Sequence, residues 1–400
     1  MSKSGVVHLV LALGGFAIGT TEFATMSLLP YLAHDLRISV PVAGHVISAY
    51  ALGVVVGAPL IAVLAARLRR RTLLIALMGV YALANGLSAV APNYRWMLAL
   101  RFLSGLPHGA YFGIAMLVAA SVVPTDQRAR AVGHVLLGLT AATIVGVPLA
   151  NWLGQVAGWR WCFAIVAALA LATAILVATL VPETRQDKRT SPSRELGALR
   201  RGQVWLTLAI GTIGFGGVFA VYTYLASTLT SVTAVSAHIV PMVLAAFGVG
   251  MTAGNIIVPY FADRAVMRTA GLLLLGSAVA LALYPFAAAH IGSVTLDVMA
   301  IGFCGALATV LQTRLMDVAG EAQNLAAALN HSAFNAANAL GPWLGGMAID
   351  AGFGWTSTGW VGCGLTLGGF LAWIVAFIAD HHRGAGATRN GRTAFEARSA

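Results

Sequence analysis

One stretch of this sequence carries no Asp, Glu, Lys or Arg from Gly202 to Ala262: GQVWLTLAIGTIGFGGVFAVYTYLASTLTSVTAVSAHIVPMVLAAFGVGMTAGNIIVPYFA. A helix that crosses a bilayer needs about 20 apolar residues, so this stretch is too long for one crossing. The Ser/Thr-rich segment Thr228–Ser236 divides it into two. The stretch therefore predicts two membrane-spanning helices joined by a short polar turn.

The rest of the chain has the same apolar character. Of its 400 residues, 59% are hydrophobic and only 9% are charged, against about 25% charged in soluble globular proteins. A soluble fold could not cover so much apolar side chain. This composition excludes a soluble enzyme, a DNA-binding domain, a secreted disulfide scaffold and a disordered chain. The three cysteines, Cys162, Cys304 and Cys363, lie in apolar runs without metal-ligand or disulfide spacing.

Charged residues interrupt the chain at intervals close to the length of one membrane span. The apolar runs between them are continuous rather than alternating, which predicts helices and excludes the strands of a lipid-facing barrel. The first apolar run, from Val6, is longer than the apolar core of a signal peptide, about 7–15 residues, and therefore predicts a first membrane span. Twelve spans are expected, at 6–33, 39–66, 72–92, 95–122, 129–155, 160–182, 203–230, 236–261, 269–290, 292–316, 322–349 and 354–379.

The expected fold is therefore an all-α polytopic membrane protein with 12 transmembrane helices in two six-helix pseudo-repeats. A polar segment between the sixth and seventh spans divides the chain. The expected domains are a six-helix bundle at 1–182, a cytoplasmic linker at 183–202, a second six-helix bundle at 203–380 and a cytoplasmic tail at 381–400.

The basic residues are distributed unequally between the two sides of this topology. Of the 24 Lys and Arg residues, Arg37, Arg95 and Arg160 lie on one side, Arg101 lies inside a span, and all others lie on the other side. Short loops rich in Lys and Arg face the cytoplasm. Both termini and the linker are therefore expected in the cytoplasm, with the chain in a bacterial-type inner membrane. The net charge of +11 is thus a topology signal; nucleic-acid or lipid binding by the linker is the minor alternative.

The two halves contain weak sequence matches at a nearly constant offset. Ala65, Arg67, Arg71 and Gly105 recur 197 positions later as Ala262, Arg264, Arg268 and Gly302, and Gly146-Val147-Pro148 precedes Gly341-Pro342 by about 195 positions. Each match is weak, and the common offset makes them informative. A duplicated six-helix bundle places a cavity at the interface of its halves, near the middle of the bilayer.

These features resemble the major facilitator superfamily of secondary transporters. The loop after the second span resembles that family's Gly-x-x-x-Asp-Arg-x-Gly-Arg-Arg/Lys signature. Ala62, Ala66 and Arg69 depart from the signature, whereas Arg67, Arg70 and Arg71 match it, and the second-half copy has Asp263 and Arg264. Arg101 and Gly105 match the family's Arg-x-x-x-Gly pattern. Gly341-Pro342-Trp-Leu-Gly345-Gly346 resembles an antiporter pattern that normally lies in the fifth helix, where this chain has only Gly146-Val147-Pro148.

Three local strings narrow the resemblance. Gly19–Phe23, Tyr50–Pro59 and Ser104–Gly113 look like the twelve-span drug:proton antiporter family, and within it arabinose-efflux-permease and chloramphenicol-exporter-like members. The resemblance implies proton-coupled efflux of a sugar, nucleoside or drug such as chloramphenicol, by alternating access. Proton-coupled uptake of a small nutrient is the alternative, followed by a channel or a membrane enzyme.

Two charges lie deep in the predicted spans. Glu22 and Arg101 lie about 15 and 10 Å from the same side at 1.5 Å per residue, so they could meet or share a cavity. A buried charge needs a partner or a task. Glu22 is the candidate proton carrier, with Arg101 influencing its protonation; the alternative is a static ion pair. His108, on the Arg101 face of the same span, is a candidate proton relay or a packing residue.

Other polar and aromatic residues are candidates for the substrate cavity. His331, Asn335 and Asn338 form one stripe that should avoid lipid, and amides recognise hydroxyls and carbonyls. Phe215, Phe219 and Tyr222 form an aromatic stripe that could line an apolar wall. For both stripes, simple contact between helices is the alternative. Tyr50 and Asn255 are further cavity candidates, and Asp297 is expected near interfacial water.

The resemblance implies roles for two more groups. A conformational latch would involve Arg67, Arg70, Arg71, Asp263 and Arg264, with Asp263 as its acid because the first loop lacks one. A helix-packing motif would comprise Gly146, Pro148, Gly341, Pro342, Gly345 and Gly346.

Nothing in the sequence indicates hydrolysis or redox chemistry. There is no Gly-x-x-x-x-Gly-Lys-Ser/Thr phosphate loop and no His-Glu-x-x-His metal site. No enzyme activity, cofactor or metal is expected. The expected partners are a small-molecule substrate, protons and the lipid bilayer, with no nucleic acid, and the chain is expected to act as a monomer.

Overall fold

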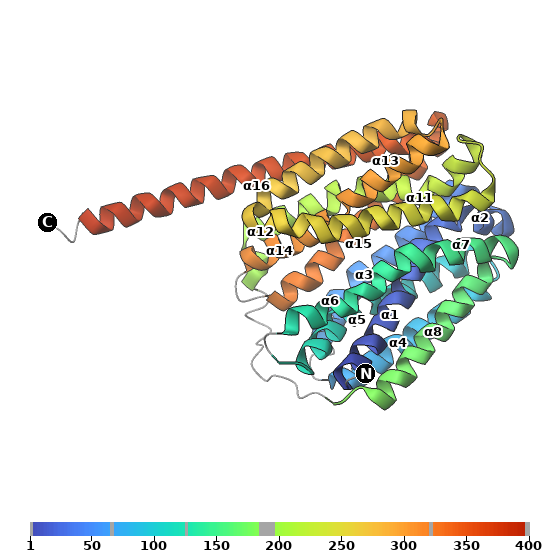
Figure 1. The fold of residues 1–400 in the computed structure, drawn as a ribbon, viewed down its shortest axis with the longest axis horizontal. Helices are drawn as coiled ribbons and strands as arrows, with labels where there is room; N and C mark the ends of the chain where they lie inside the picture. The colour runs from blue at the N-terminus through green and yellow to red at the C-terminus, as the bar shows by residue number, and fades with distance from the viewer. Residues whose placement is uncertain (1–2, 65–67, 125–126, 184–196, 320–322, 397–400) are drawn as a thin grey trace.

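The computed structural model describes residues 3–64, 68–124, 127–183, 197–319 and 323–396, and within these ranges it contains helices and no strands. The helices form one elongated bundle, from which the end of the last helix projects (Figure 1). The first half contains α1 (Lys3–Ser27), α2 (Leu29–Leu36), α3 (Val40–Leu64), α4 (Arg70–Ala89), α5 (Tyr94–Ser121), α6 (Arg128–Ala141), α7 (Val147–Val156) and α8 (Trp159–Leu180). The second half contains α10 (Gly202–Ala209), α11 (Gly216–Ser231), α12 (Val240–Ala287), α13 (Ile291–Cys304), α14 (Leu307–Ala319), α15 (Gln323–Ala348) and α16 (Ser357–Glu396).

The expected number of spans is confirmed. Ten helices of the described chain are long and apolar enough to cross a membrane. One of them, Ala237–Ala287, contains two spans, because the backbone leaves helical geometry at Ala265 (φ −159°, ψ 71°). The twelfth is α15, a 26-residue helix that is less apolar because it carries the His331, Asn335 and Asn338 stripe. The all-α polytopic fold therefore has twelve crossing helices.

Three expected spans contain local departures from α-helix. A π-helical turn, η2 (Ala142–Gly146), joins α6 to α7, and another, η4 (Ile210–Gly214), joins α10 to α11. Pro148 explains the first, since proline has no N–H and its ring clashes with the carbonyl four residues earlier. The span expected at 292–316 is broken between α13 and α14. A third π-helical turn, η6 (Ile349–Phe353), follows α15.

The two ends of the bundle differ. We call the end where Glu183 and the short 3₁₀ helix η3 (Gly197–Arg200) lie the linker side, and the end that carries α2 the opposite side (Figure 1). On the opposite side, Asp35 of α2 accepts hydrogen bonds from Arg160 and from Trp159 of α8. The hydrogen bond from the Arg160 guanidinium holds the pKa of Asp35 below its usual range. This contact fastens the loop between the first two spans to the start of α8.

Glycines set the closest helix contacts, in the same way in both halves. A Cβ at Gly105 of α5 would lie against the carbonyl oxygen of Tyr50 in α3, and a Cβ at Gly53 would lie 3.1 Å from the Cα of Gly105. In the second half, a Cβ at Gly302 of α13 would lie 3.2 Å from the backbone nitrogen of Met251 in α12. Gly302 is the repeat equivalent of Gly105. The internal repeat therefore extends from sequence to packing.

Gly53→Val should destabilise the protein, because its side chain would separate α3 from α5, and overpacking costs about 1–3 kcal/mol. Gly79→Val, in α4, is the matched control, since a Cβ at Gly79 would meet nothing within 4 Å. Thermal unfolding of the two detergent-purified variants measures the difference. Equal melting temperatures would contradict the packing argument.

Candidate functional site

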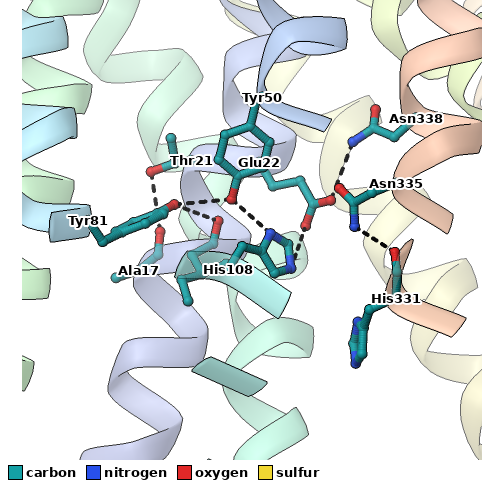
Figure 2. A network of polar contacts seen from close by, with 10 residues as sticks. Ala17, Thr21, Glu22, Tyr50, Tyr81, His108, His331, Asn335 and Asn338 are labelled. Atoms are coloured by element: carbon teal, nitrogen blue, oxygen red, sulfur yellow. Dashed lines mark hydrogen bonds and ion pairs between the residues drawn. The ribbon is translucent and has the colours of Figure 1, made fainter. Parts of the chain in front are cut away.

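The carboxylate of Glu22 is buried and contacts side chains of both halves of the protein (Figure 2). Glu22 is only 7% exposed. Within the first half, Oε2 lies 4.0 Å from Nε2 of His108 on α5. Across the interface, Oε1 accepts a hydrogen bond of 3.3 Å from Nδ2 of Asn338 on α15. One titratable group of α1 therefore bridges the two halves.

Behind His108 lies a chain of hydroxyl groups. Nδ1 of His108 is 2.8 Å from the Tyr50 hydroxyl, which is 3.4 Å from the Tyr81 hydroxyl. Tyr81 donates in turn to the carbonyl of Ile18 on α1, at 3.4 Å. Figure 2 shows these groups in one row that leads to Glu22. A phenolic hydroxyl can both donate and accept, and a neutral imidazole does so through its two nitrogens, so the row can rearrange its hydrogen bonds when Glu22 changes its charge.

Arg101 is held by aromatic rings and not by Glu22. The residue is 1% exposed, and its guanidinium lies 4.2 Å from the centre of the Tyr50 ring and 5.5 Å from that of Phe163. Its Nη1 donates to Ser104 at 3.4 Å, and its Nε has no hydrogen-bond partner among the described residues. Within its own half, the Glu22 carboxylate lies instead beside the imidazole of His108, at 4.0 Å. Among the described residues, Arg101 therefore makes no hydrogen bond or ion pair with Glu22, and its contact with Tyr50 links it to the row of groups that ends at Glu22.

The polar stripe of α15 faces the first half. The ring of His331 stacks on Phe112 of α5, with 5.7 Å between the ring centres, and lies 6.4 Å from the ring of His108. Asn335 donates to the carbonyl of His331 at 3.0 Å. The Oδ1 atoms of Asn335 and Asn338 are buried and have no hydrogen-bond partner among the described residues. The structure thus leaves two free amide acceptors beside Glu22.

The aromatic stripe Phe215, Phe219 and Tyr222 forms a wall that packs against Phe23, the residue next to Glu22. Phe219 and Tyr222 both contact Phe23, the neighbour of Glu22, with ring centres 6.3 and 5.9 Å apart. Phe215 packs against Phe219, and Tyr222 packs against Phe247 of α12 at 4.2 Å. Sequence reasoning identified neither Phe23 nor Phe247 individually. The repeat offset of 197 positions makes Phe247 the equivalent of Tyr50, and this was the signal by which Phe247 could have been found.

Two of the other polar candidates lie apart from Glu22. Asn255 accepts a hydrogen bond of 3.1 Å from Thr309 of α14, and the hydrogen bonds and ion pairs of the described residues do not connect it to Glu22. Asp297 lies on α13, where its Oδ2 is buried without a hydrogen-bond partner among the described residues. No group of three or more His, Cys, Asp and Glu residues that could hold a metal ion occurs in the described chain.

The latch candidates make contacts within one half where the structure describes them. Arg71 donates to the carbonyl of Ala178 on α8, beside a 3.0 Å ion pair of Arg69 with Glu183. Arg264 donates to Tyr260 of its own helix at 2.7 Å. Arg70 and Asp263 take part in no hydrogen bond or ion pair of the described residues, and Arg67 lies outside those residues. A latch between the halves stays a prediction.

The packing candidates bring α15 against α11. A Cβ at Gly341 would lie 2.8 Å from the nitrogen of Ala220, and one at Gly346 would lie 2.6 Å from the Tyr224 hydroxyl. Tyr224 donates to the carbonyl of Pro342 at 2.8 Å. The remaining members also lie at close contacts or at a helix start: Gly345 faces Tyr224, Gly146 faces Phe16 at 3.2 Å, and Pro148 lies in the first turn of α7. This packing positions Asn338, one turn before Gly341.

The halves also meet on the opposite side of the bundle from the linker. Gln155 of α7 donates to the carbonyl of Ala237 at 2.8 Å, and Ser48 of α3 donates to the carbonyl of Ala339 at 2.9 Å. A Cβ at Gly346 would lie 3.5 Å from Pro41. These contacts join the two halves on the opposite side.

Known proteins are similar to this chain over most of its length. A family model described as the Major Facilitator Superfamily matches residues 11–264 and 208–399. The chain is 42% identical over 350 residues to the inner membrane transport protein YdhP of Escherichia coli (strain K12), covering 87% of this chain and 90% of YdhP. It is 33% identical over 340 residues to a chloramphenicol resistance protein of Streptomyces lividans, covering 83% and 86%. The crystal structure of the nucleoside transporter NupG is similar in fold, with a TM-score of 0.76 at 13% identity, over 94% of this chain and 100% of NupG.

Variants of Tyr50 can separate its two contacts. Tyr50→Phe keeps the ring beside Arg101 but removes the hydroxyl that bonds His108, and an unpaired buried polar group costs about 1–3 kcal/mol. Tyr50→Leu also removes the aromatic face, worth about 2 kcal/mol for a desolvated cation–π contact, so it should unfold at a lower temperature than Tyr50→Phe.

Thermal unfolding in detergent measures both effects. Tyr81→Phe is the control, because the hydrogen bonds of that hydroxyl to Tyr50 and to Ile18 are both 3.4 Å long, and it should lose less stability than Tyr50→Phe. Equal melting temperatures for Tyr50→Phe and Tyr50→Leu would show that the ring contributes nothing to holding Arg101.

Proposed function

The chain belongs to the Major Facilitator Superfamily of transporters, and on this premise we propose that it exports a small molecule in exchange for protons, by alternating access between its two halves. The membership confirms the family resemblance and the expectation of a transporter rather than an enzyme. The chain is a multi-pass membrane protein, and its relatives include proteins that are named inner membrane transport proteins. We propose that it acts as a monomer, since both halves of the site come from one chain.

The observation that carries the proposal is the position of Glu22. Its carboxylate contacts His108 in its own half and Asn338 in the other. As a carboxylate, Glu22 can only accept hydrogen bonds; once protonated it becomes a donor. The orphaned Oδ1 of Asn338 is then a possible acceptor. Proton binding at Glu22 thus changes a contact between the halves, which is what coupling requires.

The groups around Glu22 favour an amphipathic substrate. The wall of Phe215, Phe219 and Tyr222 offers aromatic faces, and the amides of Asn335 and Asn338 offer hydrogen bonds. This combination suits a molecule with one apolar side and several hydroxyl or carbonyl groups. Export as the direction is supported by the relative that is named a chloramphenicol resistance protein. Sugars, nucleosides and amphenicol drugs are the classes to test first.

Export requires the opposite side to open. The contacts of Gln155 with Ala237 and of Ser48 with Ala339 hold the halves together there. In the proposed cycle, substrate enters from the linker side, proton exchange at Glu22 weakens the packing of α15 on the first half, and the contacts on the opposite side part. The latch candidates Asp263 and Arg264 would then act on the linker side when it closes.

Glu22→Gln should abolish transport driven by a pH gradient, because the amide keeps the shape of the acid and cannot release a proton. Purified protein in proteoliposomes, supplied with labelled pentoses, nucleosides and chloramphenicol, measures uphill transport. Substrate binding should survive, as tested by thermal stabilisation in detergent. The control Asp35→Asn removes a carboxylate of the opposite side and should transport normally. Concentrative transport by Glu22→Gln at the wild-type rate would refute the coupling role.

We further propose that both termini and the linker lie in the cytoplasm. Gly197→Cys and Asn93→Cys, each in a background without Cys162, Cys304 and Cys363, place one thiol on each side of the bundle. An impermeant thiol reagent should label Asn93→Cys in intact cells and Gly197→Cys only after the cells are opened. The reverse pattern would invert the topology.

A further inference from the structure

The outer surface of the first half contains an apolar groove. It has a volume of about 430 Å³ and lies between α3, α4 and α5, whose places in the bundle are seen in Figure 1. Its lining includes Ile61 of α3, Leu73, Ala76 and Val80 of α4, and Leu103 and Pro107 of α5. Val80 is 40% exposed. The groove is therefore open to the surroundings of the bundle, which for a spanning helix are lipid.

Small side chains produce this hollow. Ala76 extends only to Cβ, and a side chain at the neighbouring Gly79 would meet nothing within 4 Å. The lining is apolar throughout, so a polar or charged ligand body would lose its hydrogen bonds there.

One end of the groove lies at a cluster of arginines. Leu68 and Leu73 both line the groove, and Arg69, Arg70 and Arg71 lie between them in the sequence. Arg69 is paired with Glu183, and Arg71 donates to a backbone carbonyl. Arg70 is half-buried and takes part in no hydrogen bond or ion pair of the described residues. Among the described residues, only one of these three guanidinium groups, that of Arg69, is therefore paired with a carboxylate.

We infer that this groove is a binding site for an anionic phospholipid, with an acyl chain in the groove and the headgroup phosphate at Arg70. The apolar lining matches a hydrocarbon chain, and the excess positive charge matches a headgroup with a net negative charge. A phospholipid combines both features in the right order, because its charge lies at the membrane surface and its chains point inward. A zwitterionic lipid matches the groove but not the uncompensated arginines.

The inference is tested by lipid binding to the full-length, delipidated protein in detergent, measured by native mass spectrometry. Phosphatidylglycerol should bind more tightly than phosphatidylcholine with the same chains by about fivefold, the factor that corresponds to about 1 kcal/mol per basic residue. Glycerophosphoglycerol, which has the headgroup and no chain, should not bind. Equal affinities for the two phospholipids, or equal binding of the chainless headgroup, would overturn the site.

Two variants locate the site. Arg70→Gln should reduce phosphatidylglycerol affinity by about fivefold, whereas Arg200→Gln, an exposed arginine of the linker side, should not. Ala76→Trp should fill the groove and reduce the affinity for both phospholipids, whereas Ala168→Trp, on an exposed position of α8, should not. If each variant binds like its control, the lipid lies elsewhere. The lipid series on the unaltered protein decides between headgroup classes even if a variant fails to fold.

Discussion

The close contact of α5 with α3 at Gly105 is the constraint on which the site depends. Gly105 lies between Arg101 and His108 on one face of α5, and a Cβ there would meet the backbone of Tyr50. Because the helices touch at this level, Arg101 lies over the Tyr50 ring and His108 reaches the Tyr50 hydroxyl. In lipid the contact is stabilised by packing rather than by exclusion of water, so a small residue is what allows it. A larger side chain at position 105 would move α5 away from α3, and so move Arg101 and His108 away from Tyr50.

The same principle places the partner from the second half. Gly341 lets α15 approach α11, and Asn338 lies one turn before it. The amide that reaches Glu22 is therefore fixed by backbone packing on one side and by a hydrogen bond on the other. The backbone packing does not depend on the protonation of Glu22, whereas the hydrogen bond to Glu22 does. In the proposed coupling, a change of charge at Glu22 would therefore alter the contact between the halves without unfolding either half.

The sequence was sufficient for the fold, because continuous apolar runs of span length permit only helices in a membrane. It also placed His331, Asn335 and Asn338 on one face, and Asn338 does reach Glu22. It could not show that Arg101 faces Tyr50 and Phe163, since depth along two helices says nothing about their rotation. Phe23 carried no signal, and Phe247 carried only its pairing with Tyr50 at the offset of 197, because an apolar side chain is equally suited to lipid and to the interior of the bundle.

The two halves differ at the positions that are equivalent to the titratable residues of the site. At the offset of 197, the equivalents of Glu22, Tyr50 and His108 are Phe219, Phe247 and Gly305. The packing glycines Gly53 and Gly105 keep their equivalents Gly250 and Gly302, so the backbone geometry was retained while the titratable groups were not. Phe219 and Phe247 are members of the aromatic wall that faces Glu22 through Phe23 and Tyr222. Duplicate positions thus differ in character: in the first half they carry the titratable groups Glu22 and His108, and in the second half they carry aromatic rings and a glycine. The hydrogen-bond partner of Glu22 in the second half comes instead from the polar stripe of α15, through Asn338.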